Sequence, residues 1–391
     1  MGVLFLGPRL AAPSQLWMRR MVDAIGDDLA VLIDIQDIPE EYSTRCDTVV
    51  LESTDTKLPS LLGRVARWQK RRRHVEPISS LMDRADVDCA LVHYLVYAVR
   101  YRQVWARSGK PVFVHCHGWD VTWDLQRATP GLISNRVHPW GYEDAVRSLP
   151  DNVHFIANSR TTADKLRQIG IESHRVTVKY LGVPCELPPV SQKRKAQTEL
   201  TILYLGRLVD FKGPDLTVRA FAQARERGLE ARMLIAGDGP LKRECERLLA
   251  EYSLQDCVRM VGAVSATEGE RLRHSSDIFT AHSQTGPRSR QEEAFGVAFV
   301  EAMAAGLPAV SGRSGSLPEI VEDGSEGLLF EPGDIDAHAE AILALARDRD
   351  RRLAMGRNAR TRARRDFSLE RETRELRYIL GLADPKVESI A

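Results

Sequence analysis

The strongest chemical signal in the sequence is a pair of carboxylates, Glu293 and Glu301, in the segment EAFGVAFVE. An α-helix turns once every 3.6 residues or so, so this spacing places both on a similar face, about two turns apart. The amides of Phe295, Gly296 and Val297 would then be exposed at the helix start, where they can bind a phosphate. A carboxylate can accept two sugar hydroxyl groups. In an arbitrary sequence this spacing gives only a capping carboxylate and an exposed helix residue, but the following AMAAGLP favours a binding site.

A second candidate anion site is the segment GRLVDFKG, which follows the apolar run TILYL. We predict a strand that turns through glycines into a helix, with Arg207 and Lys212 close to the turn. Exposed amides at a helix start favour anions, and two cations add charge-assisted hydrogen bonds to a diphosphate. A turn with exposed basic residues gives the same pattern, so this segment alone does not distinguish a diphosphate site from such a turn. The next glycine turn, AGDGP, is expected to be architectural.

In the N-terminal half the informative segment is HCHGWD, which follows the apolar run PVFV and so begins at the carboxyl end of a predicted strand. His115 and His117 are its candidate site residues. Two histidines at this spacing can ligate a metal, but the sequence offers no evident third ligand. A core histidine bonded to the backbone is the other alternative.

The composition describes an ordinary globular protein and excludes several functions. The 391 residues are 43% hydrophobic and 28% charged, with a net charge of +1. A dedicated nucleic-acid binder would usually be strongly basic, so we expect no nucleic-acid partner. No apolar run approaches the roughly 20 residues that span a bilayer, and the N-terminus has no basic region before its short apolar stretch. We therefore expect a cytoplasmic protein.

Short apolar runs alternate with helical patterns along the whole chain, which predicts parallel sheets covered on both faces. The fold class is therefore α/β, with two doubly wound, Rossmann-like domains whose strand ends meet across a cleft, where such sheets bind ligands. We place the first domain at 1–186, a Pro-containing and charged linker at 187–200, and the second domain at 201–366. The segment 367–391 is predicted to form a last helix, about 369–382, that crosses back to the first domain.

Five segments occur together in the second half: GRLVDFKG, AGDGP, EAFGVAFVEAMAAGLP, SGSLPEIV and DGSEGLLF. In this order they resemble the C-terminal domain of retaining glycosyltransferases of family 4. The resemblance is close over residues 201–335 and loose in the first half. It implies the GT-B fold, an N-terminal acceptor domain and a C-terminal nucleotide-sugar domain.

The resemblance also implies roles for the donor-side residues. Arg207 and Lys212 would clamp the nucleotide diphosphate, and Glu301 would bind the ribose hydroxyls. Glu293 would hold hydroxyls of the donor sugar, assisted by the amides of the three residues that follow Ala294. The loop Ser314-Gly315-Ser316 would line the pocket, whereas Glu319 is equally well a helix cap.

On the N-terminal side the resemblance makes His117 the catalytic contact that reaches the donor sugar across the cleft. Asp120 would orient His117 or bind the acceptor, and Ser159 would lie at the cleft wall. Many relatives carry a glycine pair in the first loop. This chain keeps Gly7 but has Arg9 in the loop and lacks the second glycine, which leaves the acceptor side open.

We expect a metal-independent reaction without a cofactor, because Arg207, Lys212 and a helix start would stabilise the departing diphosphate. The alternative GT-A fold would hold Mn²⁺ through an Asp-x-Asp motif. Such strings occur at 86–88, 334–336 and 348–350, but none follows a strand in a glycine-rich setting, and we interpret all three as solvated surface. Retention is implied by the resemblance. No nucleophilic carboxylate can be nominated for a double displacement, so we adopt the front-face route as a hypothesis.

The predicted partners are a nucleotide sugar, with a UDP-sugar favoured and a GDP-sugar possible, and a glycan or lipid-linked acceptor. The basic segment 61–74, with interleaved Leu, Val and Trp, either docks on an anionic membrane surface or packs as a solvated helix. Docking would make the enzyme peripheral at the inner face of the membrane. Two other functions stay open: a GT-B-type sugar-nucleotide epimerase and a non-catalytic sugar-nucleotide-binding protein.

Overall fold

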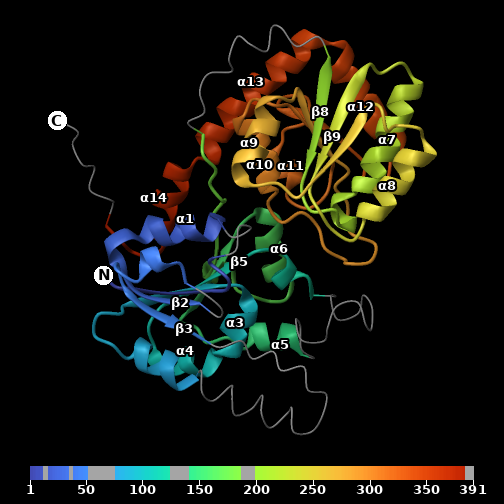
Figure 1. Ribbon diagram of the computed structural model, residues 1–391. Coiled ribbons are helices and arrows are strands. Elements are labelled where there is room, and N and C mark those ends of the chain that lie inside the picture. The colour runs from blue at the N-terminus through green and yellow to red at the C-terminus, as the bar shows by residue number, and fades with distance from the viewer. Residues whose placement is uncertain (12–15, 35–37, 52–74, 124–140, 186–198, 384–391) are drawn as a thin grey trace, which may run out of the picture.

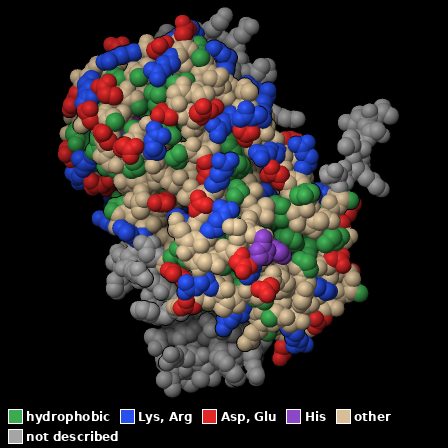
Figure 2. All heavy atoms as spheres, turned by 180° about the vertical axis from the view of Figure 1, so that it is seen from behind, with side chains coloured by type: hydrophobic (Ala, Val, Ile, Leu, Met, Phe, Trp, Pro, Cys, Tyr) green, Lys and Arg blue, Asp and Glu red, His purple; other side chains and the backbone are tan. Residues whose placement is uncertain are grey.

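A computed structural model describes residues 1–11, 16–34, 38–51, 75–123, 141–185 and 199–383 of the chain. They form two α/β lobes, each built on one parallel sheet with helices on its faces (Figure 1). Within this described part no helix is both long and apolar enough to span a bilayer. Acidic and basic side chains are interspersed over the face of the molecule that Figure 2 shows.

The N-terminal sheet has seven parallel strands in the order β3-β2-β1-β4-β5-β6-β7. Because most of these strands are continuous buried runs, both faces of the sheet must be covered. The order reverses between β1 and β4, and the ends of β4 and β5 lie beside that switch point. The strands are β1 (Val3–Gly7), β2 (Leu29–Asp34), β3 (Asp47–Val50), β4 (Cys89–His93), β5 (Val112–Cys116), β6 (Val153–Ala157) and β7 (Val176–Val178), and the helices are α1 (Leu16–Ile25), α3 (Leu95–Arg100), α4 (Arg102–Ser108), α5 (Tyr142–Arg147) and α6 (Arg160–Gln168).

The C-terminal sheet has six parallel strands in the order β10-β9-β8-β11-β12-β13. The sequence predicts strands in this half because each is a short apolar run bounded by glycine or polar residues, and the predicted ranges are 201–205, 231–236, 258–261, 278–280, 308–311 and 327–330. They agree with the structure to within one residue at each end. The strands are β8 (Leu200–Leu205), β9 (Ala231–Ala236), β10 (Val258–Gly262), β11 (Ile278–Ala281), β12 (Ala309–Gly312) and β13 (Gly327–Phe330), and the helices are α7 (Pro214–Glu226), α8 (Lys242–Glu251), α9 (Ala266–His274), α10 (Val297–Ala304), α11 (Leu317–Ile320) and α12 (Ile335–Arg347).

One long helix was not predicted. The basic segment after α12 forms α13 (Arg349–Asp366), which begins with the Asp348 side chain accepting from the Arg351 amide. Its buried face consists of small residues and one methionine rather than a leucine stripe. Gly356 lies against the Gly306 carbonyl, where a Cβ would come within 2.3 Å. The apolar periodicity was therefore too weak to reveal the helix.

The last helix, α14 (Leu369–Ile379), leaves the C-terminal lobe and packs on the N-terminal lobe beside α1 (Figure 1). Arg377 donates to the carbonyls of Ala24 and Ile25 and forms an ion pair with Asp28 at 2.9 Å. The buried ion pair between Lys179 and Glu372, 2.7 Å long, joins the same helix to the end of the N-terminal sheet. The predicted linker 187–200 lies almost entirely outside the described residues.

Candidate active site

On the donor side the structure brings together two predicted segments that are far apart in sequence. The ammonium of Lys212, at the end of the turn after β8, forms an ion pair with the carboxylate of Glu293. Both side chains are largely buried, with 15% and 11% of their surface exposed. A buried charge needs a partner, so in the described structure each of these two residues neutralises the other.

Asp210 holds the loop before α10 against the turn that carries Lys212. Its carboxylate accepts hydrogen bonds from the amides of Arg288 and Ser289 and from the Ser289 hydroxyl. Burial alone would raise the pKa of Asp210, but these hydrogen bonds hold it below its ordinary value. Asp210 therefore orders the segment that leads to Glu293.

The glycines of AGDGP support the same turn. A Cβ on Gly237 would come within 1.9 Å of the Gly206 carbonyl oxygen, and a Cβ on Gly239 would come within 2.6 Å of the Leu208 oxygen. The amide of Leu208 also donates to the Asp238 carbonyl. Only residues without a side chain allow this close backbone approach, and the architectural role predicted for this segment is confirmed.

The start of α10 is arranged as an anion site would be. Gly296 precedes the helix with a positive φ of 80°, and no side chain caps the helix start among the described residues. Phe295 is buried against the rings of Tyr180 and Phe367, which fixes the backbone here. The amides at this start are free to bind a phosphate. The 314–316 loop packs on Glu293, whose carbonyl accepts from the Ser316 amide.

Glu301 has a partner that sequence reasoning missed. Arg273, at the end of α9, forms a 3.0 Å ion pair with it. Arg20 of α1 lies close enough to interact as well: burial lowers the pKa of Arg20, while the charge of Glu301 raises it. Arg207, by contrast, is exposed, with its guanidinium carbon 5.6 Å from the centre of the Phe211 ring. Only the folded chain brings α9 and α1 beside Glu301.

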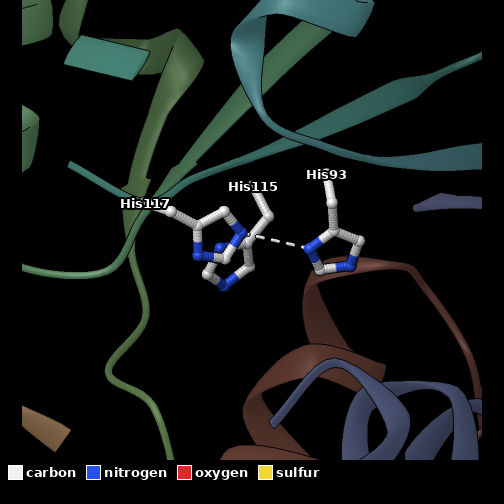
Figure 3. Close-up of side chains that lie close together, drawn as sticks. All are labelled: His93, His115 and His117. Carbon is white, nitrogen blue, oxygen red and sulfur yellow. Dashed lines mark hydrogen bonds between the residues drawn. The ribbon is translucent and has the colours of Figure 1, made fainter. Parts of the chain in front are cut away.

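On the N-terminal side three histidines gather where β4 and β5 end (Figure 3). His93 and His115 are register partners on neighbouring strands, and His117 lies two residues further on the same side. The Nδ1 atom of His93 is 3.1 Å from Nε2 of His117. His93 is thus the third histidine that the sequence did not reveal.

Burial keeps this cluster uncharged. His93 and His115 have no exposed surface, and His117 is half-buried under the ring of Trp17, whose centre is 4.3 Å away. Burial lowers the pKa of His93 to about 3, and the Lys179 charge adds to this effect. Burial also holds the pKa values of His115 and His117 well below the ordinary value.

Asp120 ties the two strand ends together. Its buried carboxylate accepts hydrogen bonds from the Leu95 amide, just after β4, and from the His117 amide, at 3.0 Å and 2.8 Å. Burial raises the pKa of Asp120 to about 6, although both hydrogen bonds act in the opposite direction. Of its two predicted roles, the contacts are those of a residue that orients His117 through its backbone.

The other predicted N-terminal residues make structural contacts. Ser159 is buried and caps α6, accepting from the Thr162 amide. Gly7 has no room for a side chain, since a Cβ would lie 2.5 Å from the Met18 sulfur. Arg9 adopts a positive φ of 61°, a conformation that glycine favours, and its amide is held by Asp34. The loop thus keeps a glycine-like backbone without the second glycine.

The two halves of the site face each other. A Cβ on Gly118, next to His117, would lie only 2.3 Å from the Cβ of Ala294, next to Glu293. Glu319 also spans the lobes: its carboxylate accepts from the amides of Arg160 and Thr161 at the start of α6. Glu319 therefore does not cap its own helix α11, but its carboxylate accepts at the start of α6 in the other lobe.

All six carboxylates of the Asp-x-Asp strings are exposed, as predicted. Asp334 and Asp348 cap the starts of α12 and α13, and Asp86 is paired with Arg84. Each of these three thus has a structural role.

Comparison with known proteins identifies the family. Residues 42–187 match the family model described as Glycosyltransferase Family 4, and residues 190–362 match the one described as Glycosyl transferases group 1. The chain belongs to glycosyltransferase family 4. The amylovoran biosynthesis glycosyltransferase AmsK of Erwinia amylovora is 27% identical over 75% of this chain and 70% of its own length. The GDP-mannose-dependent alpha-(1-6)-phosphatidylinositol monomannoside mannosyltransferase of Mycobacterium tuberculosis is 35% identical over 40% of each chain.

This family 4 chain spans only about half or less of the first curated relatives that it matches, 54% and 40% of their lengths. Among solved structures, Anabaena Alr3699/HepE in complex with UDP and glucose aligns with a TM-score of 0.74, 19% identity, and 97% and 99% coverage of the two chains. The lipopolysaccharide outer core galactosyltransferase WaaB aligns with a TM-score of 0.69, 16% identity, and 97% and 99% coverage. The fold is GT-B.

Proposed function

We propose that the chain is a retaining glycosyltransferase that moves a hexose from a nucleoside diphosphate donor to a hydroxyl of a glycan or lipid-linked acceptor. The process would be surface-polysaccharide or glycoconjugate synthesis on the cytoplasmic side of the membrane. The observation that carries this proposal is the contact between Gly118 and Ala294. His117 adjoins Gly118 and Glu293 adjoins Ala294, so this contact supports a site built from both lobes. The Lys212–Glu293 pair and an uncapped helix start would form its donor side.

The diphosphate would bind at the start of α10. Its negative charge would attract Lys212 away from Glu293, and Arg207 is exposed and free to approach from the same turn. Positive groups aimed at the leaving diphosphate stabilise the charge that develops as the glycosidic bond breaks. These groups take the place of a metal, so we propose that transfer does not require one. Nucleotide release that stops after treatment with EDTA would contradict this step.

The sugar would lie between Glu293 and His117. Once Lys212 turns to the phosphate, the Glu293 carboxylate can accept two sugar hydroxyls, and Glu301 with Arg273 would bind the ribose. The acceptor hydroxyl would attack from the side on which the diphosphate leaves, which retains the anomeric configuration. NMR of an early product with the inverted linkage would overturn this route.

We favour a UDP-sugar donor and keep a GDP-sugar as the alternative. HepE, which shares the fold, was solved with UDP, whereas the similar mycobacterial mannosyltransferase is named for its dependence on GDP-mannose. The two names support different donors, so the donor is a question for direct measurement.

The deciding experiment measures free nucleoside diphosphate after incubation with UDP-, GDP- and ADP-sugars, with and without acceptor glycans. Release from one donor, lost in Glu293→Ala, would support the proposal. Glu331→Ala is the matched control, because this carboxylate is exposed and pairs with Arg313 rather than with a residue assigned to the site, and it should keep full activity. Release that persists in Glu293→Ala would disprove the assigned site.

The same assay separates the alternatives. A sugar-nucleotide epimerase would change the donor without releasing nucleoside diphosphate in the presence of acceptor. A non-catalytic protein would bind the nucleotide, seen as a thermal shift, without consuming it. The pairing of Lys212 with Glu293 beside an uncapped helix start favours the transferase.

Attachment to the inner face of the membrane is a separate part of the proposal. The basic segment 61–74 lies outside the described residues, so only its sequence supports docking on anionic lipid. Flotation with anionic vesicles, compared with neutral ones, tests it. If the protein floats with neither kind of vesicle, membrane attachment is no longer part of the proposal.

A further inference from the structure

The cluster of His93, His115 and His117 contains more histidines than the proposed transfer reaction needs. Transfer would need one imidazole at the cleft, yet three lie with ring nitrogens within 4.8 Å of one another. Within the described part of the chain, Nε2 of His93 and both ring nitrogens of His115 have no hydrogen-bond partner. Buried polar atoms without partners are uncommon and call for an explanation.

We propose that these three histidines form a binding site for a divalent transition-metal ion, with Zn²⁺ as the representative ion. The nitrogens of His93 and His117 are 3.1 Å apart. Two nitrogens on one tetrahedral Zn²⁺ lie about 3.3 Å apart, given Zn–N bonds of about 2.0 Å.

The backbone already places the three rings. His93 and His115 are paired across β4 and β5, and Asp120 fixes the His117 backbone between the same strand ends. The ring planes are within 23° of one another (Figure 3). Rotation about the Cβ–Cγ bond of histidine has a broad energy minimum, so the nitrogens can converge on one ion without moving the strands.

The surroundings favour an ion held by nitrogen. Cys116 points to the opposite face of the strand, where its sulfur lies near the Val114 carbonyl, so no thiolate joins the cluster. Three imidazoles suit Zn²⁺, Cu²⁺, Ni²⁺ or Co²⁺ rather than Mg²⁺. The nearby charge of Lys179 opposes further positive charge at the cluster, and its ion pair with Glu372 reduces this repulsion without removing it. Because only His117 is partly exposed, an ion would enter past its ring.

A bound ion would take the His117 nitrogen that the proposed reaction offers to the sugar. The metal-loaded form would then transfer sugar more slowly, and the ion would be an inhibitor rather than a cofactor. This consequence depends on the proposed function, whereas metal binding itself does not. A direct binding measurement therefore separates a failure of this inference from a failure of the transferase proposal.

The test is titration of chelator-stripped protein with Zn²⁺ by calorimetry, and with Co²⁺ by visible absorption. We expect one ion per chain and a Co²⁺ spectrum typical of tetrahedral coordination. His93→Gln and His115→Gln should each weaken binding by more than about 100-fold, since loss of even a supporting residue costs 10–100-fold. His174→Gln, at an exposed position, is the matched control and should bind normally.

Folding of each variant is checked by circular dichroism. If a variant does not fold, the rise in melting temperature of the unmodified protein with Zn²⁺ gives an independent measure of binding. No binding by the unmodified protein would overturn the inference and leave the cluster as a hydrogen-bonded pair of neutral imidazoles beside His115. Unchanged binding in folded His93→Gln and His115→Gln would place the ion elsewhere, for example at His282 and His338, and would also overturn it.

Discussion

Gly118 of the N-terminal lobe and Ala294 of the C-terminal lobe approach so closely that a side chain on Gly118 would overlap the Ala294 methyl group, with 2.3 Å between the two Cβ atoms. Gly118 also has a positive φ of 103°, which disfavours any other residue. Since these residues adjoin His117 and Glu293, the space at this one contact sets how closely the two halves of the site can face each other.

Gly118→Ala is therefore expected to reduce transfer at least about 10-fold, a loss of about 1.4 kcal/mol in transition-state binding. Nucleotide affinity should stay near normal, because the nucleotide would bind to the C-terminal lobe. The measurements are donor kinetics and nucleotide titration. Gly109→Ala is the matched control: it also has a positive φ, 64°, but an added Cβ would meet nothing within 4 Å. Equal losses in both variants would mean that backbone strain, not the contact, matters.

Glu319→Ala should loosen the interface between the lobes. It removes the acceptor for the Arg160 and Thr161 amides and for the Tyr180 hydroxyl. Loss of a helix cap costs about 1 kcal/mol, and small-angle scattering should show a larger radius of gyration. Glu322→Ala is the control, because that carboxylate is 71% exposed. An unchanged unfolding free energy together with an unchanged radius would contradict the role given to Glu319.

Glu372→Ala should be far more damaging than an ordinary surface change, because it leaves the fully buried ammonium of Lys179 without its partner. We expect a loss of about 3–5 kcal/mol in the free energy of unfolding, measured in denaturant. The double variant Lys179→Met with Glu372→Leu removes both charges and should recover most of the lost free energy of unfolding. Glu375→Ala on the same helix is exposed enough to cost little. A double variant as unstable as the single one would show that packing, not charge, dominates.

Acid should destabilise the protein partly through His282. Burial lowers the pKa of His282 to about 4 from an ordinary 6.5. The unfolded chain therefore binds a proton before the folded chain does, so this stability is complete above pH 6.5 and is lost as the pH falls toward 4. At pH 5 the loss is about 2 kcal/mol.

His282→Gln cannot titrate, and its amide oxygen can still accept from the Gly333 amide as His282 does. The variant should show a flatter dependence of unfolding free energy on pH between 7 and 5 than the unmodified protein. His174→Gln, an exposed histidine, should not change the slope. If the unfolding free energy depends on pH equally in His282→Gln and in the unmodified protein, His282 is not the group that causes the loss of stability in acid.

Local pattern was enough to predict the strands of the C-terminal lobe. The run ARMLIA becomes β9 with the predicted ends, because it is apolar, flanked by turn residues and buried in the structure. The basic α13 was missed, since its buried residues Gly356, Ala359 and Ala363 are too small to produce an apolar stripe. Propensity of arginine and alanine for helix was the available signal.

The candidate site was predictable only within each segment. Glu293 and Lys212 could be nominated separately, but their pairing depends on a loop that Asp210 organises. His93 ends one apolar run as His115 ends another, which was a usable clue. Yet only the strand order shows that these two ends are neighbours. The partnership of Arg273 with Glu301 had no sequence signal at all.

The chain passes between the lobes at two points, and these lie side by side. The Val183 amide donates to the Phe367 carbonyl at 2.9 Å, just where one crossing begins and just before α14 starts the other. The cross-lobe contact of Glu319 lies at the same place, because Tyr180, whose hydroxyl donates to Glu319, has its ring centre 5.4 Å from that of Phe367. The ring of Phe367 thus contacts Tyr180 of the N-terminal lobe and Phe295 of the C-terminal lobe, so a change at this single residue would disturb both lobes and the helix start that follows Glu293.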